Sequence, residues 1–598
     1  MQKNTRYGFL FMALFALWPA AVYCAEDVLL EPIRVSKEKV HLLKGFSVSG
    51  KSFSILPVDS AIEALGTLPV DLQSRSPKAA IQTDFSLRGS NFQGVLMLLD
   101  GQRINDPQTG HHNADIPVTQ ADIERVEVLG GVSSSVFGPD AIGGAINFIH
   151  KKPASRKIIF ESSGGQYKTW SGLFSAADKI GKLGGRVSVE NQSSGGFYTD
   201  TDFRKFTSTI DTRLDVPDGE FALNFGYQEK EFGAYDFYTP ASGYQSKEWT
   251  KTFLLNTGLQ IEKAGFLIKP NFLWRRHYDK FMLDKTLQRS RYLNHTRTNM
   301  FTPNVYLQKE ISLLGKVGLG LEYGQEKMNS VFLGKHSRIH KSVFFDDSKD
   351  INERLSLGLS FRTDDYPGSK NNYTGSLNSK YNISEASALR LGVGRSIRVP
   401  SFTELYYNDP TTVGNAALAN ESALNYQAGY DYTKEGLFSG ITFFLRDETD
   451  SIDWVKSSPA QARWQAQNIG KAKVFGLESR LKFDLNQYLA LDSNYTYINR
   501  RMDSQGHLYK YGPNYAKHIF NSELVVALPF GKQTIGLSYK KKPLRDGWLL
   551  LNAAFSYNLN KKTQLFLKGT NLCNVGYQEI EGIPQPGRWV EGGFRVEW

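Results

Sequence analysis

The chain has 598 residues, of which 40% are hydrophobic, 13% aromatic and 22% charged, and its formal net charge is +11. This composition excludes an intrinsically disordered chain, and a mean hydropathy of −0.37 without repeated apolar runs of roughly 20 residues excludes a bundle of membrane helices. Two cysteines are too few for a disulfide scaffold or a four-cysteine zinc site, which leaves soluble β structure or a membrane barrel for a chain rich in Tyr and Gly.

The N-terminus has the order of a secretory signal peptide over residues 1–24. Two basic residues precede an apolar run at 8–17, and small residues follow. Cleavage after Cys24 and cleavage after Ala25 both fit this pattern. The basic balance of an exported protein favours contact with anionic lipid phosphates in the membrane, and we expect no nucleic-acid partner.

Residues 44–152 have the pattern of a compact α+β domain. Asp59 precedes a predicted short helix, and Thr119 begins another, with Asp122 placed for a capping box. Short apolar strands are predicted at 95–99, where the turn pair Asp100-Gly101 follows, at 126–129 and at 145–149.

The first residues of this domain, 45–52, match the phosphate-loop pattern GxxxxGK[ST]. That motif needs a helix that starts at the lysine, because the helix amides meet the phosphates. Pro57 follows too closely for such a helix, and an exported protein has no supply of ATP. We therefore reject nucleotide binding.

Residues 153–598 alternate polar and apolar side chains in segments that Gly, Asn, Asp and Pro interrupt. At roughly 20 residues for a strand and its connection, this length holds about 22 strands. Backbone amides in lipid must all be paired, so such a sheet must close, and a barrel of this width is normally plugged. In the last segment one face carries Val590, Gly592, Phe594, Val596 and Trp598, and the other carries Glu591, Gly593, Arg595 and Glu597.

Catalytic and metal motifs are absent from the sequence. Neither GxSxG nor HExxH occurs, so a surface enzyme has no support. His111 and His112 are adjacent, so their side chains diverge on an extended chain, and no third metal ligand is evident. An exposed loop pair and a ligand contact remain the two interpretations of these histidines.

The sequence between Phe85 and Pro153 closely resembles the plug of TonB-dependent outer-membrane receptors, and barrel motifs extend the resemblance to essentially the whole mature chain. Gly130-Gly131 stands where the family usually has Arg-Gly-Pro, so we expect one plug–barrel charge contact to be missing. Trp598 stands where Phe is commoner. The matching stretches are Leu87-Arg88-Gly89, Val95 to Gly101, Ile123 to Val128, Phe137 to Asn147, Arg398 to Tyr406, Gly414-Asn415, Leu418, Asn571-Leu572, Tyr577, Pro586-Gly587-Arg588 and Trp598.

The resemblance implies a mainly β fold, with an antiparallel transmembrane barrel of about 22 strands (153–598) in the outer membrane of a Gram-negative bacterium and an α+β plug (44–152) in its lumen. It implies energised uptake without enzyme activity, driven by a TonB-type periplasmic protein. The TonB-binding box would lie in residues 25–43, at Glu31, Pro32, Ile33, Arg34, Val35 and Ser36. A surface binding protein or adhesin is the alternative from another class, and it needs neither plug nor box.

For the ligand, the length and plug sequence are similar to those of cobalamin receptors, so a corrinoid is the first candidate and a ferric siderophore the alternative. Haem receptors commonly carry a histidine between Ser401 and Leu418, and none occurs here. Tyrosines offer apolar area and a hydroxyl to an amphipathic corrin. The expected contacts are the plug residues Gln108, Thr109, His111, His112 and Asn113 and the barrel-loop residues Tyr235, Asp236, Phe237, Tyr238 and Tyr244.

Calcium is a candidate cofactor, because cobalamin receptors can order their loops with calcium held by aspartates. Asp200, Asp202 and Asp236 are the residues that resemble such a site. Calcium takes six to eight oxygen ligands. Three carboxylates do not supply them, so the sequence leaves the calcium requirement open.

Overall fold

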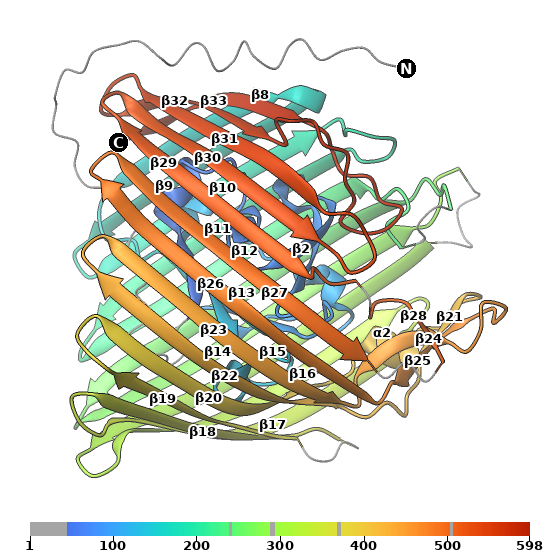
Figure 1. The fold of residues 1–598 in the computed structure, drawn as a ribbon, viewed down its shortest axis with the longest axis horizontal. Coiled ribbons are helices and arrows are strands. Elements are labelled where there is room, and N and C mark those ends of the chain that lie inside the picture. The colour runs from blue at the N-terminus through green and yellow to red at the C-terminus, as the bar shows by residue number, and fades with distance from the viewer. Residues whose placement is uncertain (1–44, 239–241, 287–292, 368–371, 503–505, 513) are drawn as a thin grey trace.

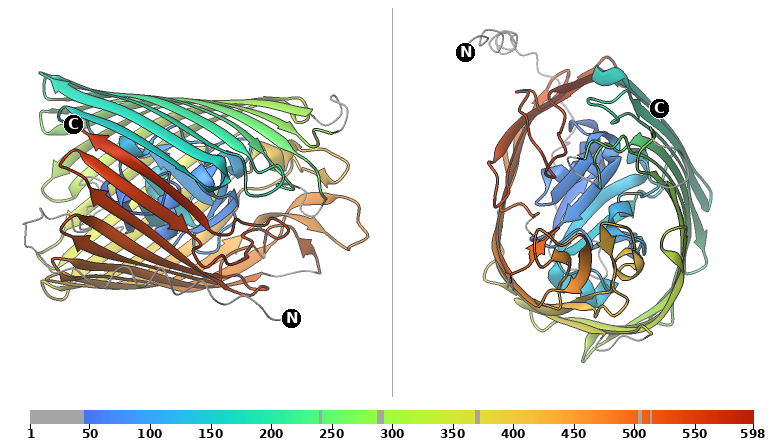
Figure 2. Two further views of the ribbon diagram at one scale, coloured as in Figure 1. Left: turned by 90° about the horizontal axis from the view of Figure 1, so that it is seen from above. Right: turned by 90° about the vertical axis from the view of Figure 1, so that its right-hand side faces the viewer.

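The computed structural model describes residues 45–598, apart from 239–241, 287–292, 368–371, 503–505 and 513. The predicted signal peptide and the predicted TonB-binding box lie outside the described residues. A closed barrel surrounds a small sheet domain, which fills the bore of the barrel (Figures 1 and 2).

The barrel is a single antiparallel sheet of 22 strands, in which β33 pairs with β8 to close the ring. This confirms the predicted fold. The strands are β8 (Lys157–Gly165), β9 (Thr169–Ile180), β10 (Leu183–Ser194), β11 (Phe203–Val216), β12 (Gly219–Gly233), β13 (Lys247–Lys263), β14 (Phe266–Met282), β15 (Leu293–Ile311), β16 (Gly315–Ser330), β17 (Gly334–Asp350), β18 (Leu355–Asp365), β19 (Tyr373–Asn382), β20 (Ser387–Arg398), β22 (Glu421–Lys434), β23 (Leu437–Thr449), β26 (Lys471–Asn486), β27 (Leu489–Met502), β29 (His518–Leu528), β30 (Gly531–Lys541), β31 (Trp548–Asn558), β32 (Thr563–Thr570) and β33 (Trp589–Glu597).

Alternation along the strands separates a lipid face from a polar lumen. On β10, Val187 is 48% exposed on the outside of the barrel, whereas Ser188 and Glu190 are buried against the contents of the bore. On β33, Phe594 faces outward and Glu591 is buried inside, as the sequence pattern predicts. An outer apolar face and a polar interior are the arrangement of an outer-membrane barrel.

Connections at the two ends of the barrel differ in length. At one end the strands join through short turns, such as the two residues between β11 and β12. At the other end the loops carry structure of their own, namely α2 (Phe402–Tyr406) and a sheet of β21 (Thr412–Val413), β25 (Trp464–Asn468), β24 (Ile452–Lys456) and β28 (Leu508–Tyr509). Short turns face the periplasm and long loops face the outside, so this sheet lies at the extracellular mouth (Figure 1). No helix among the described residues is long and apolar enough to span a membrane.

The plug is built on a five-stranded sheet in the order β1-β6-β7-β4-β5, with a separate hairpin of β2 and β3. The elements are β1 (Phe46–Ser49), β2 (Asp71–Ser76), β3 (Gln82–Ser86), β4 (Val95–Leu99), β5 (Gln102–Arg103), β6 (Ile123–Gly130), α1 (Ser134–Phe137) and β7 (Gly144–His150). Short 3-10 helices complete the described chain, at Gly50–Ser54, Glu63–Thr67, Lys78–Ala80, Gly110–His112, Gln120–Asp122, Gly131–Ser133 and, in the barrel, Gln166–Lys168.

The hydrophobic core of the plug is shared with the barrel wall. Val95, Met97 and Phe148 are fully buried in one cluster with Leu254 of β13 and Leu273 of β14. Those two leucines project inward from strands that otherwise present polar residues to the lumen. The plug therefore completes its core only inside the barrel.

One local prediction about the plug needs correction. The helix expected after Asp59 is a 3-10 helix over Glu63–Thr67, in which Ser60 rather than Asp59 accepts the Glu63 amide. A 3-10 helix, Gly50–Ser54, does begin in the phosphate-loop match, but it ends before Pro57 and no α-helix forms. The predicted capping box of Thr119 and Asp122 is confirmed.

Gly45 allows the edge strand β1 to pair with β6, because a Cβ atom at this position would overlap the carbonyl oxygen of Val128. We expect Gly45→Ala to weaken the docking of β1 by about 1–3 kcal/mol, the usual cost of overpacking. Limited trypsin digestion of the purified protein should then cleave faster after Lys51. Gly185→Ala on β10 is the control, because no atom lies within 4 Å of its added Cβ. Equal cleavage of both variants would contradict this role of Gly45.

Candidate functional site

The apical loop of the plug, residues 104–118, lies at the extracellular mouth, where α2 contacts it. The amides of Phe402 and Thr403 donate to the carbonyl oxygens of Pro107 and Gln108, at 2.9 and 3.1 Å. Strand β4 fixes the start of the loop, because Asn105 accepts from the Met97 amide and donates to the Val95 carbonyl. The loop is therefore held between the plug sheet and a barrel loop.

Hydrogen bonds within the apical loop also fix its conformation. Asp106 accepts the Gln108 amide at 2.8 Å, and Asn113 accepts the Asp106 amide at 3.0 Å. Thr109 caps the 3-10 helix that carries the two histidines. Of the predicted plug contacts, Asn113 and Thr109 therefore shape the loop, and Gln108 reaches the barrel by donating to Asp279 at 3.0 Å.

His111 joins an aromatic cluster of plug and barrel loops. Its ring stacks on Phe92 with centroids 4.2 Å apart, and Tyr511 meets Phe92 edge-on at 5.1 Å. Tyr238 of the β12–β13 loop lies 5.6 Å from His111. This proximity is consistent with the prediction that His111 and Tyr238 serve one site. Nothing in the sequence distinguishes Phe92 and Tyr511 from ordinary loop aromatics.

A buried carboxylate orients His111. Asp84 of β3 lies 2.8 Å from the Nδ1 atom of His111 and 2.7 Å from the guanidinium of Arg75. Burial lowers the pKa of His111 below its usual value, and Asp84 offsets this only in part. Burial opposes ionisation of Asp84, but Arg75 and His111 outweigh it and hold its pKa well below the usual range. Burial and Asp84 thus shift the pKa of the His111 ring in opposite directions, and the effect of burial is the larger.

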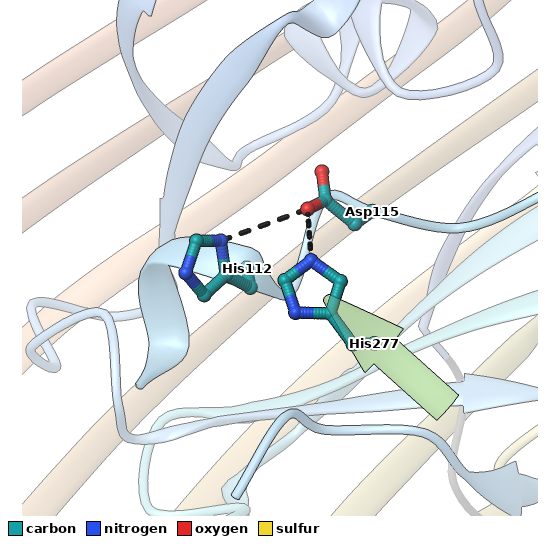
Figure 3. Close-up of side chains that lie close together, drawn as sticks. All are labelled: His112, Asp115 and His277. Atoms are coloured by element: carbon teal, nitrogen blue, oxygen red, sulfur yellow. Dashed lines mark hydrogen bonds and ion pairs between the residues drawn. The ribbon is translucent and has the colours of Figure 1, made fainter. Parts of the chain in front are cut away.

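His112 points the other way, into a buried polar cluster against the barrel wall. Its Nδ1 atom lies 3.6 Å from Asp115, and its Nε2 atom lies 3.6 Å from Asp279 of β14. His277 of β14 lies 2.8 Å from the same Asp115 oxygen (Figure 3). Burial alone would lower the pKa of His112, but Asp115 and Asp279 raise it well above its usual value.

This arrangement corrects the interpretation of His111 and His112 as an exposed pair without a third ligand. Both are buried, at 9% and 3% exposure. Their side chains do diverge, as predicted. His112 alone lies beside a further histidine, His277, and no local signal in the sequence connects His277 with the plug.

The predicted barrel-loop contacts divide into two kinds. Tyr235 is half-buried beside Tyr198, with ring centroids 5.3 Å apart, and Tyr244 is half-buried. Tyr238 donates to Glu248 at 2.9 Å. Phe237 packs instead in a buried cluster with Ala79 and Ile81 of the plug, so its side chain anchors the loop.

The three aspartates of the candidate calcium site do not form one ligand group. Asp236 accepts the Gly243 amide at 2.8 Å and so closes its own loop. Asp200 pairs with Lys285, and Asp202 is exposed. Within the described ranges, the groups of three side chains with metal-ligand spacing lie elsewhere, around His112.

Arg88 makes a plug–barrel ion pair beside Gly130, where the sequence suggested a missing charge contact. Its guanidinium donates to both oxygens of Glu478, at 2.9 and 2.7 Å, and to Gln427. A Cβ atom on Gly130 would lie 2.8 Å from this guanidinium. Arg88 thus occupies the space that a side chain at 130 would need.

Comparisons with known proteins agree with this architecture. The family model described as TonB dependent receptor-like, beta-barrel matches residues 160–572, and the TonB-dependent Receptor Plug Domain model matches residues 46–145. The chain is 25% identical over 490 residues to the iron-regulated outer membrane virulence protein of Vibrio cholerae serotype O1, covering 74% of this chain and 73% of that protein.

A second relative is the vitamin B12 transporter BtuB of Photobacterium profundum, which is 23% identical over 471 residues, covering 76% of this chain and 75% of that protein. Among solved structures, the siderophore receptor PirA from Pseudomonas aeruginosa superposes with a TM-score of 0.75 at 16% identity, covering 94% of this chain and 100% of that chain. At this identity the structural likeness shows the fold.

Proposed function

Because this chain belongs to the family of TonB-dependent receptors of the outer membrane, we propose that it is an energised transporter whose ligand is cobalamin or another corrinoid. One observation carries the transport proposal: the plug fills the bore of a closed barrel, so a large ligand passes only when the plug is remodelled.

The work for this remodelling comes from a partner in the periplasm, because the outer membrane has no supply of ATP. Ligand binds at the aromatic cluster of the mouth, and binding favours release of the segment around Ile33 into the periplasm. A TonB-type protein takes up that segment as an added strand, with main-chain hydrogen bonds that give affinity. Force on the segment then opens a path through the plug.

The corrinoid proposal is supported by the tyrosines of the mouth. Tyr235, Tyr238 and Tyr244 come from the β12–β13 loop, and Tyr511 and Phe92 lie beside His111. A corrin is large, amphipathic and rimmed by amides, so rings that carry a hydroxyl suit it. The name of the Photobacterium relative points to the same ligand.

A ferric siderophore is the second candidate, favoured by cations that lie over aromatic rings of the mouth. Lys456 lies 5.0 Å from the ring centroid of Trp464, and Lys510 lies 5.4 Å from that of Tyr511. The cation of such a pair attracts an anionic ligand, and the aromatic ring offers a surface on which an aromatic ligand can stack. The name of the Vibrio relative connects that protein with iron.

Titration of the purified protein with cyanocobalamin, beside ferric catecholate and ferric hydroxamate siderophores, tests the choice. We expect saturable binding of cyanocobalamin alone. The double variant Tyr235→Ala/Tyr244→Ala should weaken it at least about tenfold, equivalent to about 1.4 kcal/mol. Tyr430→Ala is the control, because Tyr430 is exposed on the barrel strand β22. Saturable siderophore binding without cyanocobalamin binding would replace the corrinoid by the second candidate.

A further inference from the structure

A buried cluster of histidines and carboxylates lies where the apical loop of the plug meets strand β14. His112 and Asp115 come from the loop, and His277 comes from the barrel (Figure 3). None of the three is more than 4% exposed. The described residues thus place two imidazoles and a carboxylate, from segments far apart in the chain, around one point.

The spacing of their donor atoms suits a metal ion. One ligand atom from each residue lies within 4.8 Å of the others. Asp115 Oδ2 is 2.8 Å from His277 Nε2 and 3.6 Å from His112 Nδ1. Lys230 pairs with the other oxygen of Asp115, so Oδ2 is the atom that faces both rings.

Each imidazole has a second carboxylate on its far side. Asp106 Oδ2 lies 3.3 Å from His277 Nδ1, and Asp279 Oδ2 lies 3.6 Å from His112 Nε2. Histidines that bind metal commonly donate their other ring N–H to a carboxylate, which fixes the tautomer and raises the basicity of the ligating nitrogen. A carboxylate thus lies near the outer nitrogen of each ring, although neither pair has the geometry of a hydrogen bond.

The cluster lies among four buried carboxylates and two basic side chains. The carboxylate oxygens and the two imidazole rings are groups that a divalent cation would contact. No side chain of this set is more than 5% exposed. A buried carboxylate needs a charged or hydrogen-bonding partner, and one divalent cation can serve several carboxylates at once. The charged residues are Asp106, Asp115, Glu248, Asp279, Lys230 and Arg275.

Unsatisfied polar atoms are a separate observation that points to a ligand here. Within the described chain, His277 Nδ1, Asp279 Oδ1 and Gln108 Oε1 are buried and make no hydrogen bond. His277 is 0% and Asp279 5% exposed. Buried polar atoms normally have partners, and such a concentration in one place calls for a bound species.

We propose that His112, Asp115 and His277 bind one divalent transition-metal ion of the zinc class at the contact between plug and barrel. Two nitrogens and one carboxylate oxygen are donors that zinc takes, and water completes a tetrahedral set. Calcium does not fit, because it prefers six to eight oxygen ligands. The ion ties the apical loop to β14 at His112, the residue that follows His111 of the aromatic cluster.

This inference goes beyond the proposed function, and its test needs neither the transported ligand nor the TonB-type partner. Untagged full-length protein in detergent is stripped with a chelator and titrated with Zn²⁺, and bound zinc is measured after gel filtration. We expect one zinc per chain. His277→Gln and His112→Gln should each weaken binding at least about 100-fold, because a tetrahedral site depends on every protein ligand. His150→Gln is the matched control, since His150 is a buried plug histidine that meets one carboxylate, Asp100, at 2.7 Å.

A second variant tests the site independently, in case the glutamine variants do not fold. His112→Cys in a Cys573→Ser background keeps a zinc ligand at position 112. Loaded with Co²⁺, it should show a near-ultraviolet thiolate-to-cobalt band that wild-type protein lacks. Wild-type protein that binds no stoichiometric zinc, folded histidine variants that bind as much as wild type, or a Co²⁺-loaded cysteine variant without the band would each overturn the proposal.

Discussion

Deletion of residues 31–36 is expected to reduce uptake of cyanocobalamin to the level of cells that lack the TonB-type protein, while surface binding stays within about twofold. In the proposed mechanism force enters through the deleted segment, whereas the proposed ligand contacts belong to the apical loop and the β12–β13 loop at the extracellular mouth. Uptake of cobalt-labelled cyanocobalamin at 37 °C measures transport, and retention on de-energised cells measures binding.

Deletion of residues 37–42 is the matched control, because it shortens the same segment by the same number of residues and keeps the box. We expect this variant to retain most of its uptake. Normal uptake by the 31–36 deletion would refute the transport mechanism, and it would favour a protein that only binds at the surface. Loss of binding in that deletion would instead show that the segment shapes the mouth.

Replacement of Arg398 by Met is expected to destabilise the extracellular end of the barrel by about 3–5 kcal/mol, because it leaves two buried carboxylates without their cationic partner. Arg398 ends β20 and is 1% exposed. Its guanidinium binds Glu404 of α2 at 2.8 and 3.0 Å and Glu421 of β22 at 2.7 and 2.8 Å. Samples are incubated in SDS at increasing temperatures before electrophoresis, and the temperature at which the folded band disappears measures the effect.

Two variants frame this result. Lys473→Met removes an exposed ion pair with Asp447, so its effect should stay below about 1 kcal/mol. The triple variant Arg398→Met/Glu404→Gln/Glu421→Gln removes the stranded charges as well and should recover part of the loss. If Arg398→Met and Lys473→Met unfold at the same temperature, the buried network does not stabilise the barrel mouth.

Features that depend on neighbouring residues were predictable from the sequence. The faces of β33 follow from a side-chain period of two, so Glu591 is buried and Phe594 is exposed. The capping box of Thr119 and Asp122 needs only four residues and one helix end. The family motif beginning at Arg398 was recognisable too, although only the structure gives its physical reason, the ion pairs with Glu404 and Glu421.

Features that depend on distant segments were not predictable. Asp115 and His277 are 162 positions apart, and only the seating of the plug against β14 brings them together. Asp236 looks like a metal ligand in a loop sequence, yet the conformation of the loop makes it a cap for Gly243. Phe237 likewise stands in an aromatic loop, and only the fold shows that it packs against the plug.

The core that plug and barrel share has a mechanical consequence. Leu254 and Leu273 belong to the wall, yet they are buried among plug residues. Extracting the plug as an intact body would return these side chains to water, at roughly 1.5–3 kcal/mol each, and would also strip the sheet of part of its packing. A pulling force from the periplasm, as the proposed mechanism requires, should therefore unravel the edge strand β1 more readily than it extracts the whole plug, because the two leucines then stay buried.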